Sequence, residues 1–180
     1  MAYWFWNWIF FSFLGYLLEK GFARLTHAEK QNRKCFILLP LCPVYGFSVI
    51  AVLALPQQWR SGWLLLVSSA LIPCLMEWGL HWYYERFFGV RYWDYRDQPL
   101  QWKGRVCLPF ALAWTALTPV AVLGVAPVIS RCIPLIPPFV TVGCWMLLAA
   151  DWLCSRYLLW RCGDTEMLSL GVLIHRGETA

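Results

Sequence analysis

Five long apolar runs separated by short connectors constrain this chain more than any other feature of its sequence. Each run approaches the length of about 20 residues that a helix needs to cross a bilayer. A soluble domain could not bury so much apolar surface, because 60% of the 180 residues are hydrophobic and only 14% are charged. The sequence therefore predicts an all-α polytopic membrane bundle of about five transmembrane helices, at residues 3–18, 35–55, 62–80, 106–129 and 133–153.

The basic residues predict how these helices are oriented. Thirteen of the 15 Lys and Arg residues fall in the loops 19–34 and 81–105 and in the tail 156–180, which leaves Arg60 and Arg131 on the other side. Under the positive-inside rule these loops and the tail are cytoplasmic, so the N-terminus lies outside and the C-terminus inside. Cations in short connectors do not form the basic face of a nucleic-acid-binding domain, and no nucleic-acid partner is expected.

The remaining organisation is simple, with residues 1–155 expected to form a single transmembrane domain. Two stretches, residues 16–22 and 82–88, both read aromatic-x-x-Glu-basic-x-Phe. Each precedes a basic loop and an apolar run with a proline near its start, Pro40 in one case and Pro109 in the other. This pattern predicts that helices 1–2 and 3–4 are parallel repeats, with chance recurrence of a Glu beside a cation as the alternative.

Ionisable residues inside or beside the apolar runs are the main functional candidates, because charge is costly to place in a bilayer. Glu77 lies in the third run, and His81 and Glu85 follow at four-residue intervals, so the three share one face if the helix continues to about residue 88. This strip could bind a cation, relay a proton, hold part of a metal site, or pair with Arg residues to fix packing. Glu19 and Asp151 end the first and fifth runs on the same side and could join it.

The second basic loop mixes aromatic and charged side chains. Its aspartate is expected to accept backbone hydrogen bonds in a turn, and its rings and cations suit the headgroup level of a membrane. Two interpretations stay open, namely an element that covers a cytoplasm-facing cavity and an ordered connector at the interface. The candidate site residues in this loop are Arg91, Trp93, Asp94, Tyr95 and Arg105.

Motifs for catalysis, nucleotides and metals are missing from the sequence. The eight Cys residues include no C-x-x-C pair, and there is no phosphate-binding loop, nucleophile elbow or H-E-x-x-H motif. We therefore expect no catalytic residues, no cofactor and no metal, and the sequence leans away from an enzyme.

Several motifs together resemble a known family. They are the Gly-Tyr-Leu-Leu-Glu ending at Glu19, the Pro-x-Tyr-Gly at residues 43–46, Glu77, and Trp93-Asp94-Tyr95 followed by Pro99, Gly104, Cys107 and Leu108. This set resembles the bacterial family labelled putative ABC-transporter type IV, or CmpB-like permeases. Arg96, Gln101 and Lys103 stand at places where that family tends to have Ser and Asn.

The resemblance implies a permease subunit in the bacterial cytoplasmic membrane that works with a separate ATPase subunit. Five helices are few for a transport path, so a homodimer is expected. Two further hypotheses remain, a lipid-binding or lipid-modifying protein with membrane lipid as its partner and an accessory or assembly subunit without a site of its own.

Overall fold

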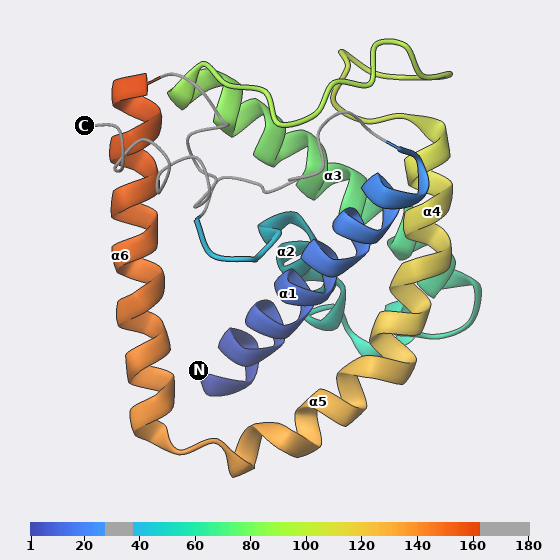
Figure 1. The fold of residues 1–180 in the computed structure, drawn as a ribbon. Coiled ribbons are helices and arrows are strands. Elements are labelled where there is room, and N and C mark those ends of the chain that lie inside the picture. The colour runs from blue at the N-terminus through green and yellow to red at the C-terminus, as the bar shows by residue number, and fades with distance from the viewer. Residues whose placement is uncertain (28–37, 163–180) are drawn as a thin grey trace.

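The computed structural model describes residues 1–27 and 38–162 (Figure 1). Within these ranges the chain is helical and has no strand, apart from an isolated bridge between Trp102 and Val106. The predicted class, an all-α membrane bundle, is confirmed. The helices are α1 (Ala2–Leu25), α2 (Pro43–Leu53), η1 (Gln57–Arg60), α3 (Gly62–Phe88), α4 (Leu108–Pro119), η2 (Val120–Val125), α5 (Ala126–Cys132), η3 (Ile133–Leu135) and α6 (Pro138–Cys162).

Three helical stretches are long and apolar enough to cross a membrane: Gly62–Phe88, Leu108–Leu135 and Pro138–Arg161. The second of them combines α4, η2, α5 and η3. Its middle turn, η2, is π-helical and directly follows Pro119. A wider turn of this kind is a common response to a helix interruption, and the chain bends between α4 and α5 (Figure 1).

The first two predicted spans differ from this pattern. Helix α1 has 24 residues, but its Trp, Tyr and charged residues lower its mean hydropathy, and it is not among the three stretches above. Helix α2 has only 11 residues, which corresponds to about 16 Å of helix, or roughly half of a hydrocarbon core. The described part of the predicted second span therefore begins with a non-helical stretch, residues 38–42.

Prolines explain why α2 starts late. Pro43 occupies the first turn of the helix, and Cys42 before it is extended, with φ −117° and ψ 94°. A residue that precedes proline is pushed out of the helical region, so the helix cannot extend backwards through Pro43. The N–H of Cys42 donates to the Ser12 carbonyl at 2.8 Å, which places the start of α2 beside the middle of α1.

Two glycines allow α1 and α2 to approach closely. A Cβ atom on Gly15 would overlap the ring of Tyr45, and a Cβ atom on Gly46 would overlap the Ser12 hydroxyl and lie 2.7 Å from the Trp8 carbonyl oxygen. Small residues at such contacts are typical of helix packing in membranes. The ring of Tyr45 is therefore held against α1 at Gly15.

The helix pairs α1–α2 and α3–α4 begin their second helices in the same way. Cys42 and Pro43 open α2, and Cys107 and Pro109 open α4. The prolines Pro43 and Pro109 are 66 positions apart, the same spacing that separates the glutamates of the repeated motif. Pro40, the proline expected to match, lies before the helix. The parallel repeat of the two helix pairs stays a prediction.

The basic segments gather at one end of the bundle. In Figure 1 the last turns of α1 and α6 lie at the same end of the bundle as the loop from α3 to α4. The N-terminus and the turn before α6 lie at the opposite end. The tail after Cys162 lies outside the described residues, as does much of the first basic loop.

Candidate functional site

The C-terminal half of α3 carries three of the predicted site residues on one face. The helix continues to Phe88, where Gly89 ends it in the left-handed conformation with φ +67°, a value that glycine adopts without strain. Glu77, His81 and Glu85 thus follow each other at one-turn intervals, as the spacing predicts. Their partners, however, differ sharply.

Glu77 is buried, with 5% of its surface exposed, and is held by neutral donors. Its Oε1 accepts a hydrogen bond from the Tyr95 hydroxyl at 2.8 Å, and its Oε2 accepts one from Trp114 Nε1 at 3.4 Å. Among the described residues no Lys or Arg pairs with it. The expected alternative, an Arg partner for Glu77, is therefore not found in this part of the chain. Keeping a charge there is costly unless polar donors compensate.

A second glutamate lies on the other side of the same aromatic residues. The Tyr45 hydroxyl donates to Glu19 Oε1 at 2.9 Å, and the Tyr45 ring packs against Trp114 with ring centroids 4.7 Å apart. We call Glu19, Tyr45, Trp114, Glu77 and Tyr95 the acidic–aromatic row. It joins α1, α2, α3, α4 and the α3–α4 loop.

Tyr95 is the member of the acidic–aromatic row that the loop between α3 and α4 contributes. Its ring stacks on Phe110 with centroids 4.8 Å apart and planes inclined by 21°. Burial raises the pKa of Tyr95 far above its ordinary value, and the negative charge of Glu77 raises it further, with smaller contributions from Glu19 and Tyr45. The phenol therefore stays protonated and acts as a hydrogen-bond donor to Glu77.

Glu85, two turns beyond Glu77, is a conventional ion-pair centre. Its Oε1 accepts from Arg91 Nε at 2.9 Å, and its Oε2 accepts from Arg105 Nη2 at 2.8 Å. The guanidinium of Arg105 also lies over the Trp78 ring, 5.0 Å from its centroid. These contacts fasten the loop to α3 and correspond to the structural interpretation of the strip.

His81 lies between the two glutamates along α3, and its hydrogen bond goes to the loop between α3 and α4 instead. Its Nε2 lies 3.0 Å from the Trp93 carbonyl oxygen, and because a carbonyl only accepts, Nε2 carries the proton. Its Nδ1 is 3.9 Å from Glu85 Oε2, beyond hydrogen-bond distance. The Trp93 ring contacts the imidazole edge-on at 5.3 Å. His81 is 3% exposed and fixes the start of the loop against α3.

The loop from α3 to α4, residues 89–107, is an ordered element that we call the cover loop. The Tyr95 N–H donates to the Gly104 carbonyl at 2.9 Å, and Trp93 Nε1 donates to the Arg105 carbonyl at 2.9 Å. Gly104 has φ +69°, and a Cβ atom there would lie 2.7 Å from Asp94 Oδ1, so a side chain at this position would be strained.

Asp94 makes the turn that the sequence predicts. Its Oδ1 accepts from the Arg96 N–H at 3.1 Å, and its Oδ2 accepts from Arg96 Nε at 2.7 Å. This Arg96 partner holds the pKa of the Asp94 carboxyl below its usual range. Asp94 therefore shapes the loop and does not face Glu77.

Asp151 has a separate role. Its Oδ1 accepts from the Leu38 N–H at 2.8 Å and its Oδ2 from the Leu39 N–H at 3.1 Å, while Ser155 Oγ donates to Oδ1 at 3.2 Å. The carboxylate thus ties α6 to the stretch that leads into α2. Its acceptor capacity serves backbone groups, and it is not part of the acidic–aromatic row.

The chain matches a known protein-family model. Residues 6–155 match the family described as Putative ABC-transporter type IV. The chain belongs to this family. Together with its apolar helices, this makes it a membrane protein linked to ABC transport. Comparison with curated proteins and with solved structures found no match.

The family region of this ABC-transporter type IV protein contains all ten predicted site residues, and the structure sorts them into three groups. Tyr45 and Trp114 belong to the first group but were not among the candidates, although Tyr45 lies in the Pro-x-Tyr-Gly motif. In the described ranges no cluster of three His, Cys, Asp or Glu residues could hold a metal ion. The groups are the row with Glu19, Glu77 and Tyr95, the ion-pair network with His81, Glu85, Arg91, Trp93, Asp94 and Arg105, and Asp151 alone.

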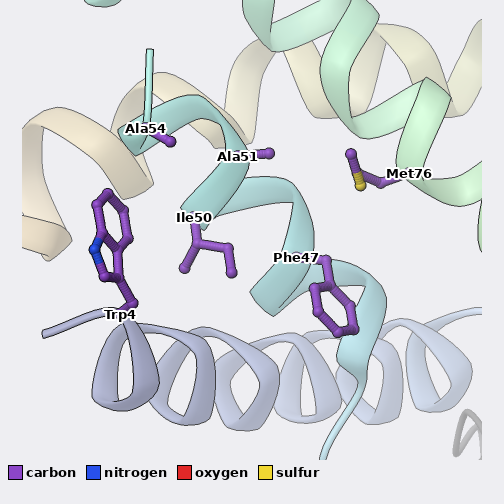
Figure 2. Close-up of a pocket in the computed structure, with 6 residues that line it drawn as sticks. All are labelled: Trp4, Phe47, Ile50, Ala51, Ala54 and Met76. Carbon is purple, nitrogen blue, oxygen red and sulfur yellow. The ribbon is translucent and has the colours of Figure 1, made fainter. Parts of the chain in front are cut away.

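A separate apolar pocket lies at the surface between α1, α2 and α3. It has a volume of about 340 Å³ and is wide open (Figure 2). Because its wall offers no polar group to orient a specific ligand, it is not a candidate functional site. Its lining residues are Trp4, Phe47, Ile50, Ala51, Ala54 and Met76.

Proposed function

We propose that this chain is the permease subunit of an ABC-type transporter and that Glu77 is the centre of its cytoplasm-facing acidic/aromatic site. The observation that carries the proposal is the burial of Glu77 between two neutral donors, Tyr95 and Trp114. Intramembrane carboxylates without a fixed cationic partner commonly mark ion, proton or substrate pathways.

The chemistry of this site follows from its donors. Tyr95 and Trp114 each offer one N–H or O–H group, which stabilises a carboxylate but does not neutralise it. Glu77 can therefore take up a proton or the cationic group of a substrate and release it when the donors are rearranged. Glu19, bonded to Tyr45, lies at the other end of the same row and supplies a second acceptor. A site between the two helix pairs is typical of repeat-built transporters.

The same proposal sets the location and orientation. We place the protein as a multi-pass protein in the bacterial cytoplasmic membrane, with the N-terminus outside and the cover loop and C-terminus inside. The support is the distribution of cations and their gathering at one end of the bundle (Figure 1). Labelling of cysteines introduced at Arg24 and Arg91 by an impermeant reagent in intact cells tests this, and modification from outside contradicts it.

The proposed partners are a separate ATPase subunit and a second copy of the chain. The sequence has no phosphate-binding loop, so energy from ATP must enter through another polypeptide. The small number of helices supports a transport path formed by two copies. Purification of the tagged chain in mild detergent tests both partners, and a strictly monomeric protein without an associated ATPase contradicts them.

The role of Glu77 is tested by matched variants on one helix face. In the reconstituted complex, Glu77→Gln is expected to abolish the coupling of ATP hydrolysis to transport while the ATPase subunit stays bound. Glu85→Gln, the control, removes a charge from the ion-pair network and is expected to leave coupling intact in the folded fraction. Equal coupling in both variants favours the accessory-subunit hypothesis instead.

A further inference from the structure

The tip of the cover loop, residues 96–104, exposes apolar side chains between cations. Leu100 is 79% exposed and Trp102 is 62% exposed. Arg96 and Lys103, both exposed, flank them. Exposed bulky apolar side chains flanked by charged ones are typical of surfaces that a membrane or another molecule covers.

The tip holds these side chains in fixed positions. Gln101 Oε1 accepts from the Gly104 N–H at 2.7 Å, and the Arg105 N–H donates to the Trp102 carbonyl at 3.1 Å. Leu100 and Lys103 adopt left-handed backbone conformations, with φ +49° and +54°. Non-glycine residues rarely adopt these values, and such conformations persist only where the surroundings impose them. The exposure of Leu100 and Trp102 is thus a property of a defined turn.

The tip lies against the part of α3 that faces lipid. The Trp102 ring is 6.1 Å from the ring of Trp78. Trp78 follows Leu71 and Leu75 on one helical face, and Leu71 and Leu75 are 58% and 64% exposed within a candidate membrane span. Trp82, one turn further, is 43% exposed. The uncovered side of Trp102 therefore continues a surface that meets acyl chains.

The depth of this contact is that of a membrane interface. The expected third span, residues 62–80, ends next to Trp78, and Trp residues concentrate at this level of a bilayer. On the other side of the loop, Leu108 opens α4 and is itself 41% exposed. The tip is thus bracketed by lipid-facing residues of two helices.

We propose that the tip is a membrane anchor that binds anionic phospholipid. Trp102 and Leu100 enter the boundary between headgroups and acyl chains, and Lys103 contacts lipid phosphate. Arg96 is neutralised by Asp94, with Nη2 2.6 Å from Oδ2, and by the nearby exposed Asp97, whereas Lys103 has no ion pair in the described ranges. Charge complementarity therefore selects an anionic leaflet through Lys103. This anchor does not depend on an ATPase partner or on transport through Glu77.

Photocrosslinking in native membranes tests which partner covers the tip. The photoreactive residue p-benzoylphenylalanine replaces Trp102 in one variant and Leu100 in another. Trp145, 56% exposed on α6, is the lipid-facing control position, and Arg86, exposed near the end of α3, is the water-facing control. We expect phospholipid adducts by mass spectrometry at the tip and at Trp145 but not at Arg86. Protein adducts at both tip positions, or no adducts there while Trp145 reacts, overturn the proposal.

Lipid selectivity is tested separately with charge variants. The purified full-length chain is placed in nanodiscs that contain phosphatidylcholine with a minor fraction of phosphatidylglycerol, and the bound phosphatidylglycerol is counted by native mass spectrometry. Lys103→Gln is expected to lower its binding about fivefold, the effect of one cation at an anionic surface. Arg86→Gln is the matched control and is expected to change it little. Equal binding by wild type and Lys103→Gln contradicts the selectivity.

Discussion

Glu77 and Glu85 lie on the same face of α3, two turns apart, yet they are held in opposite ways. Glu85 accepts hydrogen bonds from two guanidinium groups, those of Arg91 and Arg105. Glu77 accepts from a phenol and an indole and is more deeply buried. The comparison shows that helical spacing brings side chains to one face but does not decide whether their charges are neutralised.

The difference follows from where each glutamate meets the rest of the chain. Glu85 faces the basic ends of the cover loop, where cations can approach from water. Glu77 faces Tyr95 and Trp114 in the interior. An Arg side chain there would have to lose its hydration, which costs free energy. A network at the first position stabilises the fold, whereas the carboxyl group at the second has no Lys or Arg partner among the described residues.

The largest expected effect on stability comes from removing Glu85 from its ion pairs. Glu85→Ala leaves Arg105, whose side chain is only 14% exposed, without its carboxylate. We expect a loss of about 3 kcal/mol in the free energy of unfolding, because an unpaired, partly buried charge remains. Thermal or denaturant unfolding in detergent measures this. A loss below about 1 kcal/mol would show that Trp78 alone holds Arg105 in place.

The next largest effect on stability is expected from removing a neutral hydrogen-bond donor of Glu77. Tyr95→Phe removes the hydroxyl that donates to Glu77 and leaves a buried carboxylate oxygen without that donor. The expected cost is about 2 kcal/mol, as for other unsatisfied buried groups. In a double-mutant cycle with Glu77→Gln, the coupling energy should exceed about 0.5 kcal/mol. Additive effects would mean that the hydrogen bond contributes nothing to stability.

A smaller effect is expected when Glu77 loses its charge but keeps its shape. Glu77→Gln retains a carbonyl oxygen for Tyr95 and removes the cost of burying a carboxylate, so stability should fall by less than about 1 kcal/mol or rise. The isosteric Glu85→Gln, measured in the same unfolding assay, should cost more, because its two partners are cations. The reverse order would contradict the distinction between the two glutamates.

The smallest effect belongs to the exposed pair of Asp94 and Arg96. Asp94→Asn should cost about 0.5 kcal/mol near neutral pH, as for surface ion pairs. Because Arg96 lowers the pKa of Asp94 in the folded protein, the stabilisation is present above the pKa of the unfolded chain, about 3.9, and is lost as pH falls through the lower folded value. The difference in melting temperature between wild type and Asp94→Asn should therefore shrink as the pH falls through the lowered pKa of Asp94. A difference that grows on acidification would contradict this sign.

Local patterns in the sequence predicted local structure well. The spacing of Glu77, His81 and Glu85 predicted a shared face, and Asp94 predicted a turn. Pro40 and Pro43 already signalled a late helix start, but the length of the apolar run favoured a full span. Apolar length measures hydrophobicity alone, whereas proline geometry decides where the helix begins.

Contacts between distant segments could not be predicted from the sequence. Tyr45 meets Glu19 across 26 residues, Trp114 meets Glu77 across 37, and Asp151 meets Leu38 across 113. Such pairs depend on how the helices pack, and a carboxylate in an apolar run has the same sequence signal whether it binds a ligand or two backbone N–H groups. The sequence therefore placed Asp151 with the candidate site, although the structure gives it a different task.

The bond between Asp151 and the stretch before α2 constrains how the protein is made. The N–H groups of Leu38 and Leu39 leave the ribosome more than a hundred residues before the carboxylate that accepts their hydrogen bonds. Until α6 is in place, these N–H groups need another hydrogen-bond acceptor, from water or from the insertion machinery. An unsatisfied N–H group costs several kcal/mol in lipid. The first helix pair can therefore reach its final form only after α6 has been synthesised, and a chain truncated before Asp151 should be a substrate for membrane quality control.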